Sequence, residues 1–177
     1  DRLGRDKDHE YFYPLRVKEI KTKKLSTILD EYNEDRIDLI KLDTQGSEYE
    51  ILQSMDSDRM NNLLAVEVEV QLKHPQIHKG TGYLWEIQRY LQNYGLEIWN
   101  LKAGGSEMPK NKYQEFLFDK SETIEERGYC LNRITEVDVL FIRSYDNILK
   151  NNDKRCIRRY ITLLCAFYFF TEAISFV

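Results

Sequence analysis

The first strong pattern along the chain is an apolar run that stops at a carboxylate. Four of the six residues from 37 to 42 are apolar, and Asp43 follows them directly. Gly46 then allows a tight turn, and apolar residues recur at helical spacing from residue 48 to residue 55. The pattern predicts a buried strand over 37–42, a turn, and a helix over 48–55.

Similar patterns predict further elements. Strands are expected over 63–71, 96–101 and 137–143, and helices over 25–32 and 83–94, with Gly95 suited to a left-handed helix cap. Strands that alternate with helices indicate an α/β fold with a mostly parallel sheet and helices on both faces. The last strand follows a poorly patterned region from Gly104 to about Thr135, so it is compatible with antiparallel pairing.

The strand predicted over 63–71 carries charge in an unusual place. From residue 65 to residue 71 polar and apolar residues alternate, which puts Glu67, Glu69 and Gln71 on one face and the valines on the other. A central parallel strand covered on both faces is normally apolar throughout. The carboxylates therefore have partners or line a cleft at the strand end, or else the strand lies at a sheet edge with one wet face.

Asp43 lies at the carboxyl end of its predicted strand, which is where open parallel α/β sheets bind ligands. Alternatively, it caps the following helix, where backbone N–H groups and the helix dipole favour a carboxylate. For Glu48, in the first helical turn, complementing the helix dipole is the favoured role. Because the strand over 63–71 comes next along the chain, we expect its end to lie beside Asp43.

Composition and charge restrict the function classes. The 177 residues suit one domain, and a net charge of −4 argues against nucleic acid as the main partner, since phosphate binding needs a basic surface. The three cysteines show no Cys-x-x-Cys spacing, and reduced thiols suit a cytoplasmic protein. His74 and His78 have an i, i+4 spacing, but Pro75 opposes a helix there, so no metal site is predicted.

The two ends of the chain suggest a fragment with a helical tail. The sequence begins at Asp1 inside a charged segment, from which we expect that an N-terminal part is missing. Residues 160–177 are mostly apolar and long enough to cross a membrane. However, Glu172 interrupts them and the apolar positions recur at helical spacing, which favours a helix packed on a soluble domain over membrane insertion.

A resemblance to a known family connects these patterns. The segment from Ile40 to Glu48, followed by Ile51 and Leu52, closely resembles the strand–turn–helix signature of the FkbM-type methyltransferases. A weaker resemblance continues over residues 66–69, 83–95 and 137–142. The resemblance implies a Rossmann-like class I methyltransferase fold whose N-terminal strands and glycine-rich cofactor loop would lie upstream of Asp1. It implies a partial methyltransferase domain over 1–145 and a helical C-terminal tail over 146–177.

The resemblance also implies an activity. We expect an O-methyltransferase that moves a methyl group from S-adenosylmethionine to a hydroxyl of a sugar, glycan or similar small molecule. The candidate catalytic residues are Asp43 and Glu67, the candidate cofactor-binding residues are Asp43, Gln45 and Gly46, and the candidate substrate-binding residues are Lys41, Glu69 and His78. Asp43 would lie nearest the methyl group, and Glu67 would orient or deprotonate the acceptor. The alternative is a non-catalytic α/β interaction module derived from a methyltransferase.

Overall fold

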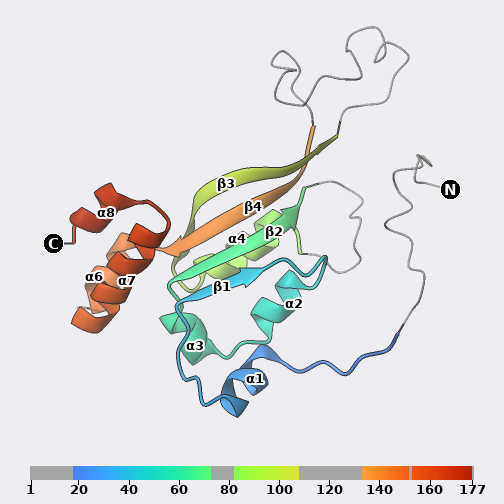
Figure 1. The fold of residues 1–177 in the computed structure, drawn as a ribbon, viewed down its shortest axis with the longest axis horizontal. Coiled ribbons are helices and arrows are strands. Elements are labelled where there is room, and N and C mark those ends of the chain that lie inside the picture. Colours follow the sequence, from blue (N-terminus) through green and yellow to red (C-terminus); the bar gives the residue numbers. More distant parts are fainter. Residues whose placement is uncertain (1–17, 73–81, 108–132, 152, 177) are drawn as a thin grey trace, which may run out of the picture.

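A computed structural model describes residues 18–72, 82–107, 133–151 and 153–176 (Figure 1). The strands are β1 (Leu39–Leu42), β2 (Ala65–Gln71), β3 (Leu96–Glu107) and β4 (Arg133–Arg143). The helices are α1 (Leu25–Glu31), α2 (Glu48–Gln53), α3 (Ser57–Asn62), α4 (Leu84–Gln92), α6 (Tyr145–Asn151), α7 (Lys154–Ala166) and α8 (Phe170–Ile174). The described strands form a single sheet with helices packed on both of its faces, which confirms the predicted α/β class and the predicted placement of helices on both faces.

The sheet order is β1-β2-β4-β3. β1 and β2 pair in parallel, whereas β4 is antiparallel to both of its neighbours. The prediction of a mostly parallel sheet is therefore wrong for the described strands. The cause is the insertion of one reversed strand, since β1, β2 and β3 all run in the same direction and β4 separates β2 from β3. The alternative that β2 is an edge strand is also wrong, because β2 has a neighbour on each side.

Two apolar cores cover opposite faces of the sheet. Val66, Val68 and Val70 are fully buried against α1, α2, α3 and α4, and burying an aliphatic side chain contributes roughly 1.5–3 kcal/mol. On the other face, Ala65 and Ile142 pack against α6, α7 and α8. These three helices gather at the end of the sheet to which β4 points, and the carboxyl ends of β1 and β2 point away from them (Figure 1).

Three helical segments differ from the predictions. No helix was predicted where α3 lies. It begins after Asp56, whose side chain accepts a hydrogen bond from the Arg59 backbone N–H at 2.9 Å. The helix α6 likewise occupies a polar segment for which no helix was predicted. The single helix expected over 160–177 is instead α7 and α8, separated by a turn in which Tyr168 has a φ of +65°. No helix in the described ranges is long and apolar enough to span a membrane.

β3 is longer than the predicted strand over 96–101. It continues through Gly104 and Gly105, where an irregular loop was expected, and it stays paired with β4 as far as Glu107. The pairing register shifts on both sides of Gly105, as at a β-bulge. Pairing with β4 therefore overrides the low strand propensity of the two glycines.

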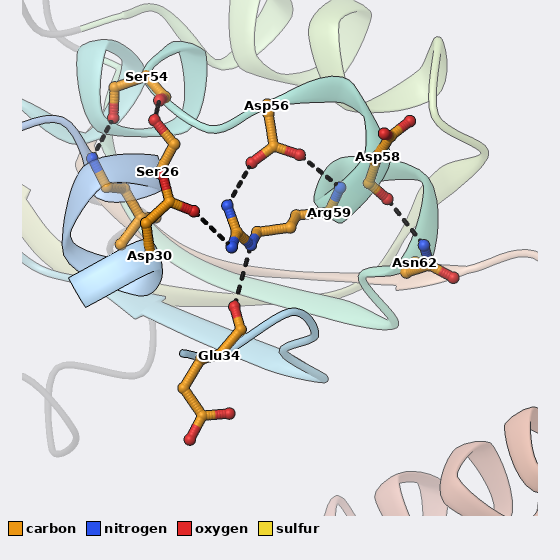
Figure 2. A network of polar contacts seen from close by, with 9 residues as sticks. Ser26, Asp30, Glu34, Ser54, Asp56, Asp58, Arg59 and Asn62 are labelled. Atoms are coloured by element: carbon orange, nitrogen blue, oxygen red, sulfur yellow. Dashed lines mark hydrogen bonds and ion pairs between the residues drawn. The ribbon is translucent and has the colours of Figure 1, made fainter. Parts of the chain in front are cut away.

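A network of polar contacts centred on Arg59 joins α1 to α3 (Figure 2). The Arg59 guanidinium donates to a carboxylate oxygen of Asp30 and to one of Asp56, each at 2.8 Å. It also donates to the backbone carbonyl of Glu34 at 3.0 Å. Two carboxylates and the turn that follows α1 therefore share one cation, which fixes the helical layer beneath β1.

Arg143 ties the end of β4 to two helices. Its side chain is buried, and it donates to the backbone carbonyls of Met60 at 2.9 Å, Leu63 at 2.8 Å and Tyr94 at 2.6 Å. Burial lowers the pKa of the Arg143 guanidinium. These carbonyls lie at or just beyond the carboxyl ends of α3 and α4, where the helix dipole favours a cation. Arg143 therefore anchors both helices to the sheet.

Candidate active site

The turn after β1 carries the candidate cofactor-binding residues. Gln45 and Gly46 have φ values of +56° and +123°, and Ser47 occupies the N-cap position of α2. A positive φ is natural for Gly46, whereas a residue with a side chain pays about 1–3 kcal/mol for such a conformation. The surrounding contacts must therefore hold Gln45 in place.

Glu48 supplies part of this restraint. Its buried carboxylate accepts hydrogen bonds from the Thr44 N–H at 2.7 Å, the Thr44 hydroxyl at 2.9 Å and the Gly46 N–H at 3.0 Å. Glu48 does lie in the first turn of α2, as expected, but it also folds back to fix the turn that follows Asp43. An acidic residue at a helix start is the sequence signal for both roles, so the pattern could not reveal the second one.

The pairing of β1 with β2 brings the predicted residues to one face of the sheet. Its register places Lys41 opposite Glu67, and the Lys41 Nζ forms an ion pair with the Glu67 Oε1 at 2.7 Å. The hydrogen bond to Glu67 and the charge of Glu67 raise the pKa of the Lys41 ammonium. Glu67 is therefore a carboxylate that already has a cationic partner.

Gln45 connects the ends of the two strands. Its side-chain amide donates to the Glu69 Oε2 at 2.8 Å and to the Asp43 Oδ1 at 3.2 Å. The strained backbone of Gln45 thus directs its amide between two carboxylates that come from different strands. The predicted proximity of the two strand ends is confirmed, and the pair that meets there is Asp43 and Glu69.

Negative charge predominates around Glu69. Asp138 on β4 lies opposite Glu69 in the sheet register, and Glu136 lies two pairs further along, opposite Gln71. Burial raises the pKa of the Glu69 carboxyl, and the charges of Glu136, Asp43 and Asp138 raise it further. This part of the sheet therefore favours a ligand that carries positive charge or donates a proton.

All predicted site residues within the described ranges lie on β1 and β2 or in the turn after β1, with Glu67 further from the carboxyl end of its strand than Glu69. They are Lys41, Asp43, Gln45, Gly46, Glu67 and Glu69. The remaining candidate, His78, lies outside the described residues. In the part of the chain that the structure covers, no group of three or more His, Cys, Asp or Glu side chains is arranged to hold a metal ion.

A comparison with protein families gives this arrangement a context. Residues 4–98, more than half of the chain, match the family model described as the methyltransferase FkbM domain. The matched range contains β1, β2 and the turn between β1 and α2. No curated protein and no solved structure gives a significant match.

Proposed function

The chain belongs to the FkbM methyltransferase domain family, and from this premise we propose that it is an S-adenosylmethionine-dependent O-methyltransferase with a Rossmann-like class I fold. Its acceptor is a hydroxyl of a sugar, glycan or similar small molecule. The observation that carries the proposal is the junction of Asp43 and Glu69 through Gln45 at adjacent strand ends, since α/β sheets bind ligands there. The common direction of β1, β2 and β3 supports the proposed fold.

The residues at these strand ends fit a cationic methyl donor. S-Adenosylmethionine, when bound, supplies a methyl group attached to a positively charged sulfonium. Asp43 and Glu69, with two further carboxylates on β4, give the site a negative charge that attracts such a cation. Asp43, Gln45 and Gly46 would hold the donor, and Gly46 permits close approach to the backbone because it has no Cβ.

The acceptor must be held so that its oxygen lies roughly 3–3.5 Å from the methyl carbon. Asp43 is the proposed residue nearest the methyl group. Glu67 is suited to accept a hydrogen bond from the acceptor, because its ion pair with Lys41 at 2.7 Å fixes the carboxylate in one position. Orientation of this kind accounts for a large part of the barrier reduction in bimolecular reactions.

Calorimetric titration of S-adenosylmethionine into a form that carries the complete methyltransferase domain, cofactor loop included, tests the binding step. We expect saturable binding by the wild type and a loss of about tenfold or more in affinity for Asp43→Asn, because a charged contact typically contributes about 1.5–3 kcal/mol. Asp30→Asn is the matched control, since it removes a carboxylate from the Arg59 network, and its affinity should stay unchanged. Absence of binding by the wild type would contradict the proposal and favour the interaction-module alternative.

Turnover tests the chemical step. With a labelled donor methyl group and a panel of sugar and glycan acceptors, Asp43→Asn should lower the rate about a hundredfold or more, in the range found for a positioned catalytic carboxylate. Near-normal rates in this variant would remove Asp43 from the mechanism.

A further inference from the structure

We propose that Glu69, rather than Glu67, accepts the proton of the acceptor hydroxyl, and that Gln45 is the positioning residue that holds Glu69 against Asp43. This inference rests on the proposed methyl transfer and names the base within it. It follows from the partners of the two glutamates, which lie two residues apart on the same face of β2.

The two glutamates differ in what they contact. Glu67 is bound to Lys41 at 2.7 Å, so a proton on Glu67 would have to displace a cation. Glu69 instead receives a neutral amide N–H from Gln45 at 2.8 Å. A neutral donor orients a carboxylate without cancelling its charge, and the carboxylate keeps its capacity to take up a proton.

The backbone conformation of the turn fixes the position of the Gln45 side-chain amide. Gln45 occupies the left-handed region with a φ of +56°, and Glu48 binds the backbone N–H groups of the residues on either side of it. The amide then reaches both Glu69 and Asp43. Strain that is held in place by buried contacts is typical of functional sites.

The charged groups that face Glu69 in the described ranges come from three strands. Asp43 follows β1, and Asp138 and Glu136 lie on β4, where Lys102 of β3 stands opposite Asp138. Lys41 on β1 is a second cation that interacts with Asp43 and Asp138, but the carboxylates outnumber the two cations, and together with burial they raise the pKa of Glu69.

The proton transfer is balanced within this arrangement. The O–H bond of the acceptor breaks, its proton passes to a carboxylate oxygen of Glu69, and the electron pair stays on the oxygen. That oxygen would form the bond to the methyl carbon while the donor's methyl–sulfur bond breaks and its electron pair leaves with the sulfur. Asp43 remains ionised beside Glu69, where it favours the protonated form of its neighbour. Release of the proton to water restores the ionised pair.

Carbon-13 NMR titration of the side-chain carboxyls in the full chain tests the inference without turnover. We expect Glu69 to titrate above the usual range of a glutamate, and Asp43→Asn to lower the Glu69 midpoint. Gln45→Gly keeps the positive φ and removes the side-chain amide. In this background, adding Asp43→Asn should shift the Glu69 midpoint by less than half of the shift that Asp43→Asn causes in the wild type. Titration of Glu69 in the usual range of a glutamate, or a full Asp43 effect without Gln45, would overturn the inference.

Kinetics separate this inference from the proposed function. Glu69→Gln should lower kcat about a hundredfold or more with little change in the KM for the acceptor and should abolish the acidic limb of the pH–rate profile, whereas Glu67→Gln should mainly raise the KM for the acceptor. If the wild type binds the donor but Glu69→Gln keeps a normal kcat and the acidic limb of the pH–rate profile, the inference is wrong and the proposed function still stands. Failure of the wild type to bind the donor overturns the proposed function, and the inference with it.

Discussion

The network around Arg59 and the cluster around Glu69 are both rich in carboxylates, but their charges are balanced differently. In the network, one guanidinium lies within 2.8 Å of two carboxylates (Figure 2). In the cluster, a neutral amide from Gln45 bridges Glu69 and Asp43, and two more carboxylates stand on the neighbouring strand. One region satisfies its charges internally, while the other leaves negative charge that a ligand can satisfy.

The pKa shifts have opposite signs in the two regions. Hydrogen bonding to the Arg59 backbone N–H and side chain lowers the pKa of the Asp56 carboxyl, whereas burial and neighbouring carboxylates raise the pKa of Glu69. Ionisation of Asp56 therefore favours the folded state, and ionisation of Glu69 opposes it. The ionised Glu69 carboxylate therefore lowers the stability of the fold, which is expected of a residue kept for binding or catalysis.

The largest effect on stability should come from the Arg59 network. Arg59→Ala removes the shared donor of two carboxylates and a backbone carbonyl, and we expect the melting temperature to fall by roughly 5 °C. Lys41→Ala, which breaks the exposed ion pair with Glu67, is the matched control and should lower it by less than about 2 °C. Equal losses in the two variants, measured by calorimetry, would show that the two regions do not differ as described.

A smaller effect should appear in the pH dependence of stability. The Asp56 carboxylate stabilises the fold above its unfolded pKa of 3.8, and this contribution is lost as the pH falls through the lower folded value. The pKa of Glu69 is instead higher in the folded state than its unfolded value of 4.5. Its protonated carboxyl therefore stabilises the fold below pH 4.5, and this contribution is lost as the pH rises through the folded pKa.

Urea denaturation of Asp56→Asn and Glu69→Gln between pH 3 and pH 7 checks these signs. At pH 7 we expect Asp56→Asn to be less stable than the wild type and Glu69→Gln to be equally or more stable. Both differences should shrink as the carboxyls become protonated, with Glu69→Gln converging at the higher pH. A Glu69→Gln variant that loses stability at pH 7 would contradict the sign assigned to Glu69.

The sequence pattern predicted the arrangement of the strand ends better than their contacts. Alternation along β2 placed Glu67 and Glu69 on one face, and chain order placed β2 beside β1, because both depend on strand geometry alone. Which glutamate meets Asp43 depends on the register of the two strands and on the φ of Gln45. Neither quantity has a signal in the sequence.

The errors in the fold have a related cause. The helices α3 and α6 have six and seven residues, so each is too short for apolar residues to show a clear helical period. The extension of β3 through Gly104 depends on pairing with the distant strand β4, whose antiparallel direction the sequence had allowed. Local propensity does not encode such pairing.

The carboxylates at the ends of β1 and β2 are therefore proposed to serve a ligand rather than the fold. The most direct test measures the free energy of unfolding and the affinity for S-adenosylmethionine in the same preparations of the double variant Asp43→Asn, Glu69→Gln at pH 7. We expect unchanged or higher stability together with an affinity lower by about a hundredfold or more, since two charged contacts are lost. A loss of stability as large as that of Arg59→Ala, with the affinity unchanged, would contradict the proposal.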